Sequence, residues 1–188
     1  MSVLHKLTKA RANLVMGNPF FGTLALRLKF VEDRSIKKMS TDGISLKYNP
    51  DFVKDLPLSK VEGGLAHTVM HPALLHHTRR GDRDIGKWNK ACDYSVNTML
   101  VNAGFDLPEG TFQNAQYAGM AAEHIYSLLP DEPKSDDGSD GGGDGGGGGG
   151  SNDPGGDGGV EDSPQSTNSG ASQSQQGHEE SEWKQEIG

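Results

Sequence analysis

The chain has 188 residues, and its charge is distributed unevenly. Residues 1–130 contain 16 Lys and Arg against 12 Asp and Glu, whereas residues 131–188 contain 2 against 14, so the net charge of −8 comes from the C-terminal part. That part also holds 17 of the 27 glycines, and it has too little apolar surface to offset the entropy of ordering. We therefore expect one folded domain of about 130 residues followed by a disordered tail.

Several classes of protein are excluded by the composition. The single cysteine, Cys92, cannot form an intrachain disulfide or a C-x-x-C metal site, and we expect it to be a small buried residue. No apolar run approaches the ~20 residues of a membrane span, and the N-terminal segment lacks the pattern of a secretion signal. The only tight basic cluster, at residues 79–83, is too small to indicate nucleic-acid binding. We expect a cytoplasmic protein without a membrane partner.

The first half of the domain combines a helix with short strands. Apolar residues recur at helical spacing over residues 2–16, with Ser2 as N-cap and Gly17 as a stop signal. The apolar run at 20–33 could be a strand or a helix, and its alternation favours a strand at least over the second half. Asp42-Gly43 predicts a turn between two short extended pieces.

The second half of the domain is predicted to be helical. Ser59 and Glu62 have the spacing of a capping box at the start of a helix. A second helix is predicted after the turn at 81–84 and ends at Gly104, and a short third helix covers about Ala121 to Leu129. Helices combined with a few strands in this order predict an α+β fold.

The predicted helix that starts near Ser59 carries a cluster of histidines, His67, His71, His76 and His77. His67 and His71 are four residues apart, so they share one helix face and can bind one ion. Zinc accepts neutral imidazole and requires a third protein ligand. Because Pro72 is expected to break the helix beside His71, the third ligand stays open between His76, His77 and Asp93 of the next helix.

The pair has the spacing of the zinc-protease signature H-E-x-x-H, but Thr68 stands where that signature has glutamate. The glutamate is the general base of such enzymes and not a metal ligand. Threonine does not titrate near neutrality and cannot replace it. The pattern alone therefore fits either a metal site that lacks its base or a histidine-rich helix surface that binds no metal.

A longer resemblance surrounds this motif. The chain resembles the metallopeptidase domain that precedes a VWA-like domain in bacterial and phage proteins, over segments 41–43, 48–53, 65–84, 87–100, 103–110 and 118–129. The positions that match the family pattern are His67, His71, His76, Arg79, Arg80, Gly81, Trp88, Asn89, Asp93 and Asn97. Thr68 departs from it.

The resemblance implies a zincin-like fold, in which a small sheet packs against the active-site helix. It also implies a zinc site of His67 and His71 completed by His76 or Asp93, and the matching Asn97, Arg79 and Trp88 become candidate supporting residues. The implied partners are a MoxR-type AAA+ ATPase or another protein, and the implied substrate of an active member is a peptide or protein.

Residues 131–177 resemble the Gly/Asp-rich linker of this family, and residues 178–188 resemble the start of a truncated C-terminal region. Our leading hypothesis is a metal-binding or interaction module whose catalysis is impaired by Thr68. One alternative is an active zinc peptidase in which Glu62 or Asp93 serves as a displaced base. The other is a structural module without metal.

Overall fold

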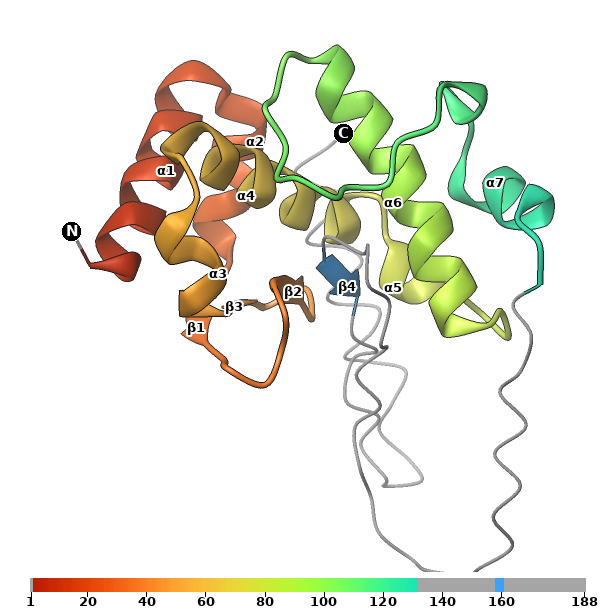
Figure 1. Ribbon diagram of the computed structural model, residues 1–188, viewed down its shortest axis with the longest axis horizontal. Helices are drawn as coiled ribbons and strands as arrows, with labels where there is room; N and C mark the ends of the chain where they lie inside the picture. Colours follow the sequence, from red (N-terminus) through yellow and green to blue (C-terminus); the bar gives the residue numbers. More distant parts are fainter. Residues whose placement is uncertain (1, 132–157, 161–188) are drawn as a thin grey trace, which may run out of the picture.

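The computed structural model describes residues 2–131 and 158–160, and Figure 1 shows their arrangement. The described residues form an α+β fold, as predicted. Its elements are α1 (Val3–Gly17), α2 (Pro19–Arg27), β1 (Lys29–Glu32), β2 (Met39–Thr41), β3 (Ser45–Tyr48), α3 (Pro50–Asp55), α4 (Leu58–Ala73), α5 (His76–Arg79), α6 (Ile85–Asn102), a 3-10 turn (Ala115–Tyr117), α7 (Ala122–Leu128) and β4 (Gly158–Val160).

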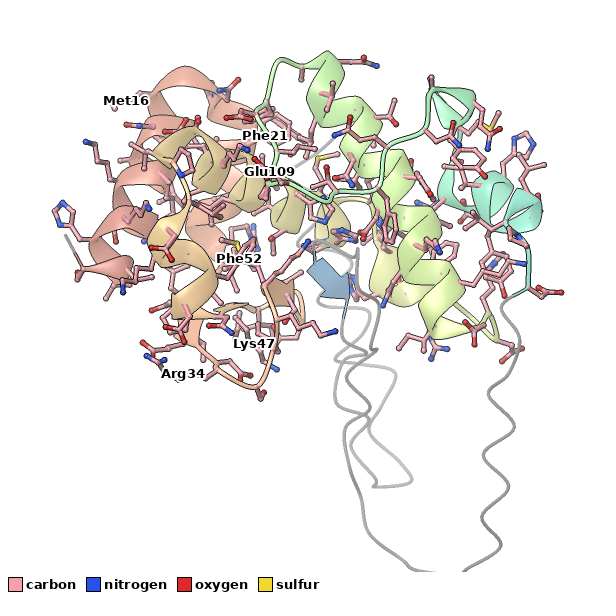
Figure 2. The ribbon with its side chains drawn as sticks, viewed as in Figure 1. Met16, Phe21, Arg34, Lys47, Phe52 and Glu109 are labelled. Carbon is pink, nitrogen blue, oxygen red and sulfur yellow. The ribbon has the colours of Figure 1, made fainter. Side chains whose placement is uncertain are left out.

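Helix α4 lies at the centre of the molecule, with α1, α2 and the sheet on one side and α6 on the other (Figure 1). One apolar cluster joins α4 to α1, α2 and the strands, and a second joins α4 to α6 through residues such as Ala66 and Val96. Phe21 of α2, labelled in Figure 2, makes an edge-on contact with Phe105 that connects the two sides, and the ring centroids are 4.8 Å apart. Among the described residues, no helix is long and apolar enough to cross a membrane.

The small sheet has the strand order β1-β3-β2-β4. Strands β2 and β3 form the predicted antiparallel pair around Asp42-Gly43. The Asp42 carboxylate accepts from the backbone N–H groups of Ile44 and Ser45, and Gly43 has a φ of 88°, so both turn residues have the roles that favour them in turns. Strand β4 lies within the segment expected to be disordered, and residues 132–157 and 161–188 of that segment are outside the described residues.

The N-terminal helix is confirmed, but the strand prediction that follows it was partly wrong. Ser2 caps α1 by accepting from the backbone N–H of His5. Residues Pro19–Arg27 form helix α2, and only Lys29–Glu32 are extended. The alternation of leucines was misleading because Leu24 is buried whereas Leu26 is 58% exposed, which is a helical rather than a strand pattern. Proline at the first position of a helix also favours this start.

The capping box predicted for α4 is absent, because both of its residues have other partners. The helix begins at Leu58 after Pro57, the Ser59 hydroxyl donates to the Asp106 carboxylate, and Glu62 accepts from the Asn13 side chain at 2.6 Å. Tertiary packing stabilises the helix instead: from Gly63 to Ala73 every residue is buried.

Gly63 and Gly64 are expected to respond oppositely to substitution by alanine. A Cβ on Gly63 would clash with the backbone oxygen of Asp106, whereas one on Gly64 would meet the Met39 side chain at an ordinary 3.5 Å. We expect Gly63→Ala to destabilise the fold by at least about 2 kcal/mol through overpacking. Gly64→Ala is expected to be neutral or to stabilise the fold by up to ~1 kcal/mol through helix propensity. Urea unfolding of the two variants tests this, and equal effects would contradict it.

Candidate metal centre

The centre is built where α4 and α6 pack against each other. His67 and His71 lie one turn apart on α4, and Asp93 faces them from α6. The two Nε2 atoms are 2.9 Å apart, and the Asp93 Oδ1 atom lies 3.4 Å from each of them. All three residues are about 1% exposed. Three potential ligand atoms therefore converge in a buried position.

The orientation of His67 is set by Asn97 on α6. The Asn97 Nδ2 group donates to the backbone carbonyl of Phe112, and this fixes Oδ1 toward His67 Nδ1 at 2.7 Å. Because an amide oxygen only accepts, the proton of neutral His67 must be on Nδ1. Its Nε2 lone pair therefore points to His71 and Asp93, as a metal ligand requires.

His76 contacts His71 on the side away from the cluster. Its Nδ1 lies 3.2 Å from His71 Nδ1, whereas the Nε2 atom of His71 faces His67 and Asp93. Trp88 holds His76 by donating its indole N–H to the His76 backbone carbonyl at 3.0 Å. His76 is therefore placed to orient His71. The third candidate ligand, beside the Nε2 atoms of His67 and His71, is the carboxylate of Asp93.

The path of the chain around Pro72 explains this placement. The predicted break at His71 does not occur, because α4 continues through Pro72 and ends at Ala73. Leu75 then adopts a left-handed conformation with a φ of 56°, and α5 begins at His76. This turn directs His76 back against His71, and of the described residues only His67, His71 and Asp93 form a ligand-like cluster.

Burial and neighbouring groups control the charge of the centre. Burial lowers the pKa of His71, and burial together with the nearby His71 and Arg79 lowers the pKa of His76 further. Burial by itself would raise the pKa of Asp93, but the adjacent His67 and His71 side chains outweigh it and hold this pKa at about 2. The centre thus combines two imidazoles whose neutral form is favoured, His71 and His76, with one ionised carboxylate.

These residues fit a divalent metal ion by two criteria. Ligand atoms at 2.0–2.1 Å from a tetrahedral zinc ion are roughly 3.3 Å apart, and the three separations here are 3.4, 3.4 and 2.9 Å. In addition, Asp93 Oδ1 is buried and has no hydrogen-bond partner. A buried charged oxygen without a donor is costly, and a cation would satisfy it.

Thr68 stands at the position that the H-E-x-x-H pattern fills with glutamate. Its hydroxyl donates to the backbone carbonyl of Gly64 at 2.8 Å, and the residue is 1% exposed. The two proposed replacements are engaged elsewhere, because Glu62 accepts from Asn13 and Asp93 faces the histidines. Thr68 itself only forms a hydrogen bond within its own helix, and its hydroxyl cannot accept a proton near neutral pH.

The supporting residues lie around the centre in different ways. Trp88 is buried, as is Cys92, whose pKa is raised by burial and by nearby Asp93. The predicted family match at Arg79 has a structural basis, because its guanidinium forms a bidentate pair with Glu123 that joins α5 to α7. Arg79 thus holds the chain segment that carries His76.

Asn89 is a residue that the motif match included without a role. It lies one turn before Asp93 on α6 and is 9% exposed, and its Oδ1 atom is buried without a hydrogen-bond partner. The spacing of Asn89, Asp93 and Asn97 at intervals of four residues places all three on one face of α6. That periodicity is the signal in the sequence by which Asn89 could have been found.

The metal-free chain is expected to lose stability as the pH falls from 7 to 5. His71 and His76 have lowered pKa values in the folded state. As the pH falls below about 6.5, the ordinary pKa of histidine, these side chains are therefore protonated in the unfolded chain before they are protonated in the folded one. Each histidine can then contribute a slope of up to about 1.4 kcal/mol per pH unit. Asp93, with a pKa of about 2, contributes stability that is lost only below about pH 4.

Urea unfolding in the presence of a chelator at pH 7.5, 6.5 and 5.5 measures this loss. His76→Gln is expected to flatten part of the profile, because it removes one of the two groups. A stability that does not change between pH 7 and 5 would contradict the assignment of neutral buried histidines.

Comparison with known proteins assigns the chain to a family. The family model described as "putative metallopeptidase domain" matches residues 2–188. An uncharacterized protein of Thermotoga maritima is 30% identical over 110 residues, which cover 54% of this chain and 28% of that protein. This chain therefore spans well under half of the relative's length. No solved structure matches the chain. By the extent of the family match, the chain belongs to the putative metallopeptidase domain family.

Proposed function

We propose that the chain binds one zinc ion through His67, His71 and Asp93 and acts as a metal-binding interaction module with strongly reduced peptide hydrolysis. The observation that carries this proposal is the convergence of two imidazole Nε2 atoms on a buried carboxylate oxygen that has no hydrogen-bond donor. A set of two histidines and one carboxylate is also a common ligand set of catalytic zinc sites.

A zinc ion held by three protein ligands supplies Lewis acidity at its open coordination position. Other residues of this chain would orient the ligands. Asn97 would hold the His67 proton on Nδ1, and His76 would accept the Nδ1 proton of His71, so that both Nε2 lone pairs would be available to the ion. Such outer contacts fix ring orientation and raise ligand basicity.

Reduced hydrolysis follows from the position of Thr68. Loss of a general base typically lowers the rate 10²–10⁴-fold. The contact of Glu62 with Asn13 and the position of Asp93 among the candidate metal ligands argue against either carboxylate as a substitute base. The family membership supports a hydrolase-like ancestry for the site, and Thr68 supports a present role in binding.

The zinc content of the purified full chain tests the proposal. We expect about one zinc per chain after dialysis against zinc and a weak chelator. His67→Ala is expected to remove it, and His124→Ala, which changes an exposed histidine outside the cluster, is expected to retain it. A parent chain with no bound zinc, or a His67→Ala variant with the parent's content, would refute the proposal.

A further inference from the structure

Strand β4 covers an edge of the sheet beside the metal centre. Strand β2 pairs with β3 along one edge, and Gly158–Val160 pair with it along the other, in parallel and in the register Met39↔Gly158, Ser40↔Gly159 and Thr41↔Val160. Without β4, the described part of the sheet would end at β2. A bare edge presents unpaired N–H and C=O groups to which another strand can add.

The same strand also lies against both helices of the centre. Contacts link β4 to α4, which carries His67 and His71, and to α6, which carries Asp93. Figure 1 shows β4 beside β2 and below α4. One segment from far along the chain therefore adjoins the sheet edge and the two helices from which the candidate ligands come.

The composition of β4 suits recognition through the backbone. Two of its three residues are glycines, and glycine within a strand is typical of places where backbones approach closely. Strand addition derives its affinity from main-chain hydrogen bonds, so it does not require large side chains.

From these contacts we propose that the edge of β2 opposite β3 is a strand-addition site for an extended, glycine-rich peptide segment, and that Gly158–Val160 are its intramolecular occupant. The occupant restricts access to the metal centre. This regulatory consequence rests on the proposed zinc site, whereas the strand-addition site itself does not. Tethering gives the chain's own segment a high effective concentration, so an external peptide binds only when that segment is displaced.

The first experiment removes the pairing in the full chain. Gly159→Pro combined with Val160→Pro eliminates the N–H donors at both positions, whichever of the two donates to β2. Gly145→Pro combined with Gly146→Pro is the matched control in the same glycine-rich segment. Hydrogen exchange at the amides of Met39, Ser40 and Thr41 is measured in the metal-free proteins.

We expect at least one of these amides to exchange ten or more times faster in the 159/160 variant and at the parent rate in the control. Parent-like exchange in the 159/160 variant would overturn the pairing. Because zinc is absent from this experiment, its result does not depend on whether the chain binds metal.

The second experiment supplies the β4 sequence as a separate peptide. A fluorescent peptide with the sequence of residues 155–162, GGDGGVED, is expected to bind the 159/160 variant and not the parent, whose edge is occupied. The same peptide with prolines in place of its Gly159 and Val160 equivalents is expected not to bind. Equal binding of both peptides, or no binding of either, would overturn the strand-addition site.

Access to the centre is measured with zinc-loaded protein and an excess of chelator. We expect zinc removal to be at least tenfold faster in the 159/160 variant than in the parent and the 145/146 control. Equal rates with intact zinc binding would overturn the regulatory part alone. Absence of zinc from all three proteins would instead refute the proposed function and leave the exchange and peptide results standing.

Discussion

Asp93→Asn is expected to abolish zinc binding at micromolar concentrations, whereas His76→Ala is expected to weaken it by roughly 10–100-fold. Asp93 contributes the oxygen that lies 3.4 Å from both Nε2 atoms, and asparagine keeps its size while removing the charge. His76 contacts only the far nitrogen of His71. Loss of His76 would therefore leave the His71 ring less well oriented but would not remove a metal ligand. Competition with a chelating dye at pH 7.5 gives both affinities.

His77→Ala serves as the control, because this neighbour of His76 is not part of the three-residue cluster. Circular dichroism of each metal-free variant separates a lost ligand from a lost fold. If Asp93→Asn bound zinc as the parent does and His76→Ala did not, the third ligand would be His76. The assignment of Asp93 as a zinc ligand would then be wrong.

The part of the site that could be predicted from the sequence is the part that depends on local geometry. The four-residue spacing of His67 and His71 survives any packing of their helix, because the helix alone brings the rings together. Asp93 remained one of three candidates, because its approach depends on how α4 and α6 pack through buried residues such as Ala66 and Val96. No local pattern encodes that approach.

The position of His76 depended on a conformation that its neighbour rarely adopts. Leu75 has a φ of 56°, and positive φ is uncommon for residues with a large side chain. Propensity therefore could not predict the turn, although Pro72 correctly drew attention to the end of the helix. The conformation is imposed by tertiary contacts, among them the bond from the Trp88 indole to the His76 carbonyl.

The errors in the fold have a similar origin. Ser59 and Glu62 have capping-box spacing, but partners more than forty residues away engage both side chains. The alternation of leucines in residues 24–28 resembles a strand only if each alternate residue is buried, and Leu26 is not. Local patterns were reliable where no distant group competed for the same atoms, as at Ser2 and Asp42.

Thr68→Glu is expected to raise zinc-dependent peptide hydrolysis at least 10²-fold over the parent chain, which corresponds to the contribution of a general base. The substitution supplies the residue that the H-E-x-x-H pattern requires while leaving His67, His71 and Asp93 unchanged. The cost is a buried helix hydrogen bond, because the Thr68 hydroxyl donates to the Gly64 carbonyl. Cleavage of an unstructured protein substrate, followed with and without zinc, measures the gain.

Thr68→Gln is the decisive control, because glutamine has nearly the same shape as glutamate but cannot accept a proton near neutral pH. If loss of the base explains the reduced activity, only the glutamate variant gains hydrolysis, while both variants bind zinc and unfold at similar temperatures. Equal hydrolysis by the parent and the glutamate variant would show that the chain already has a base, and the role of Thr68 proposed here would be wrong. A gain shared by both variants would attribute the effect to the altered helix contact at Gly64 and not to proton transfer.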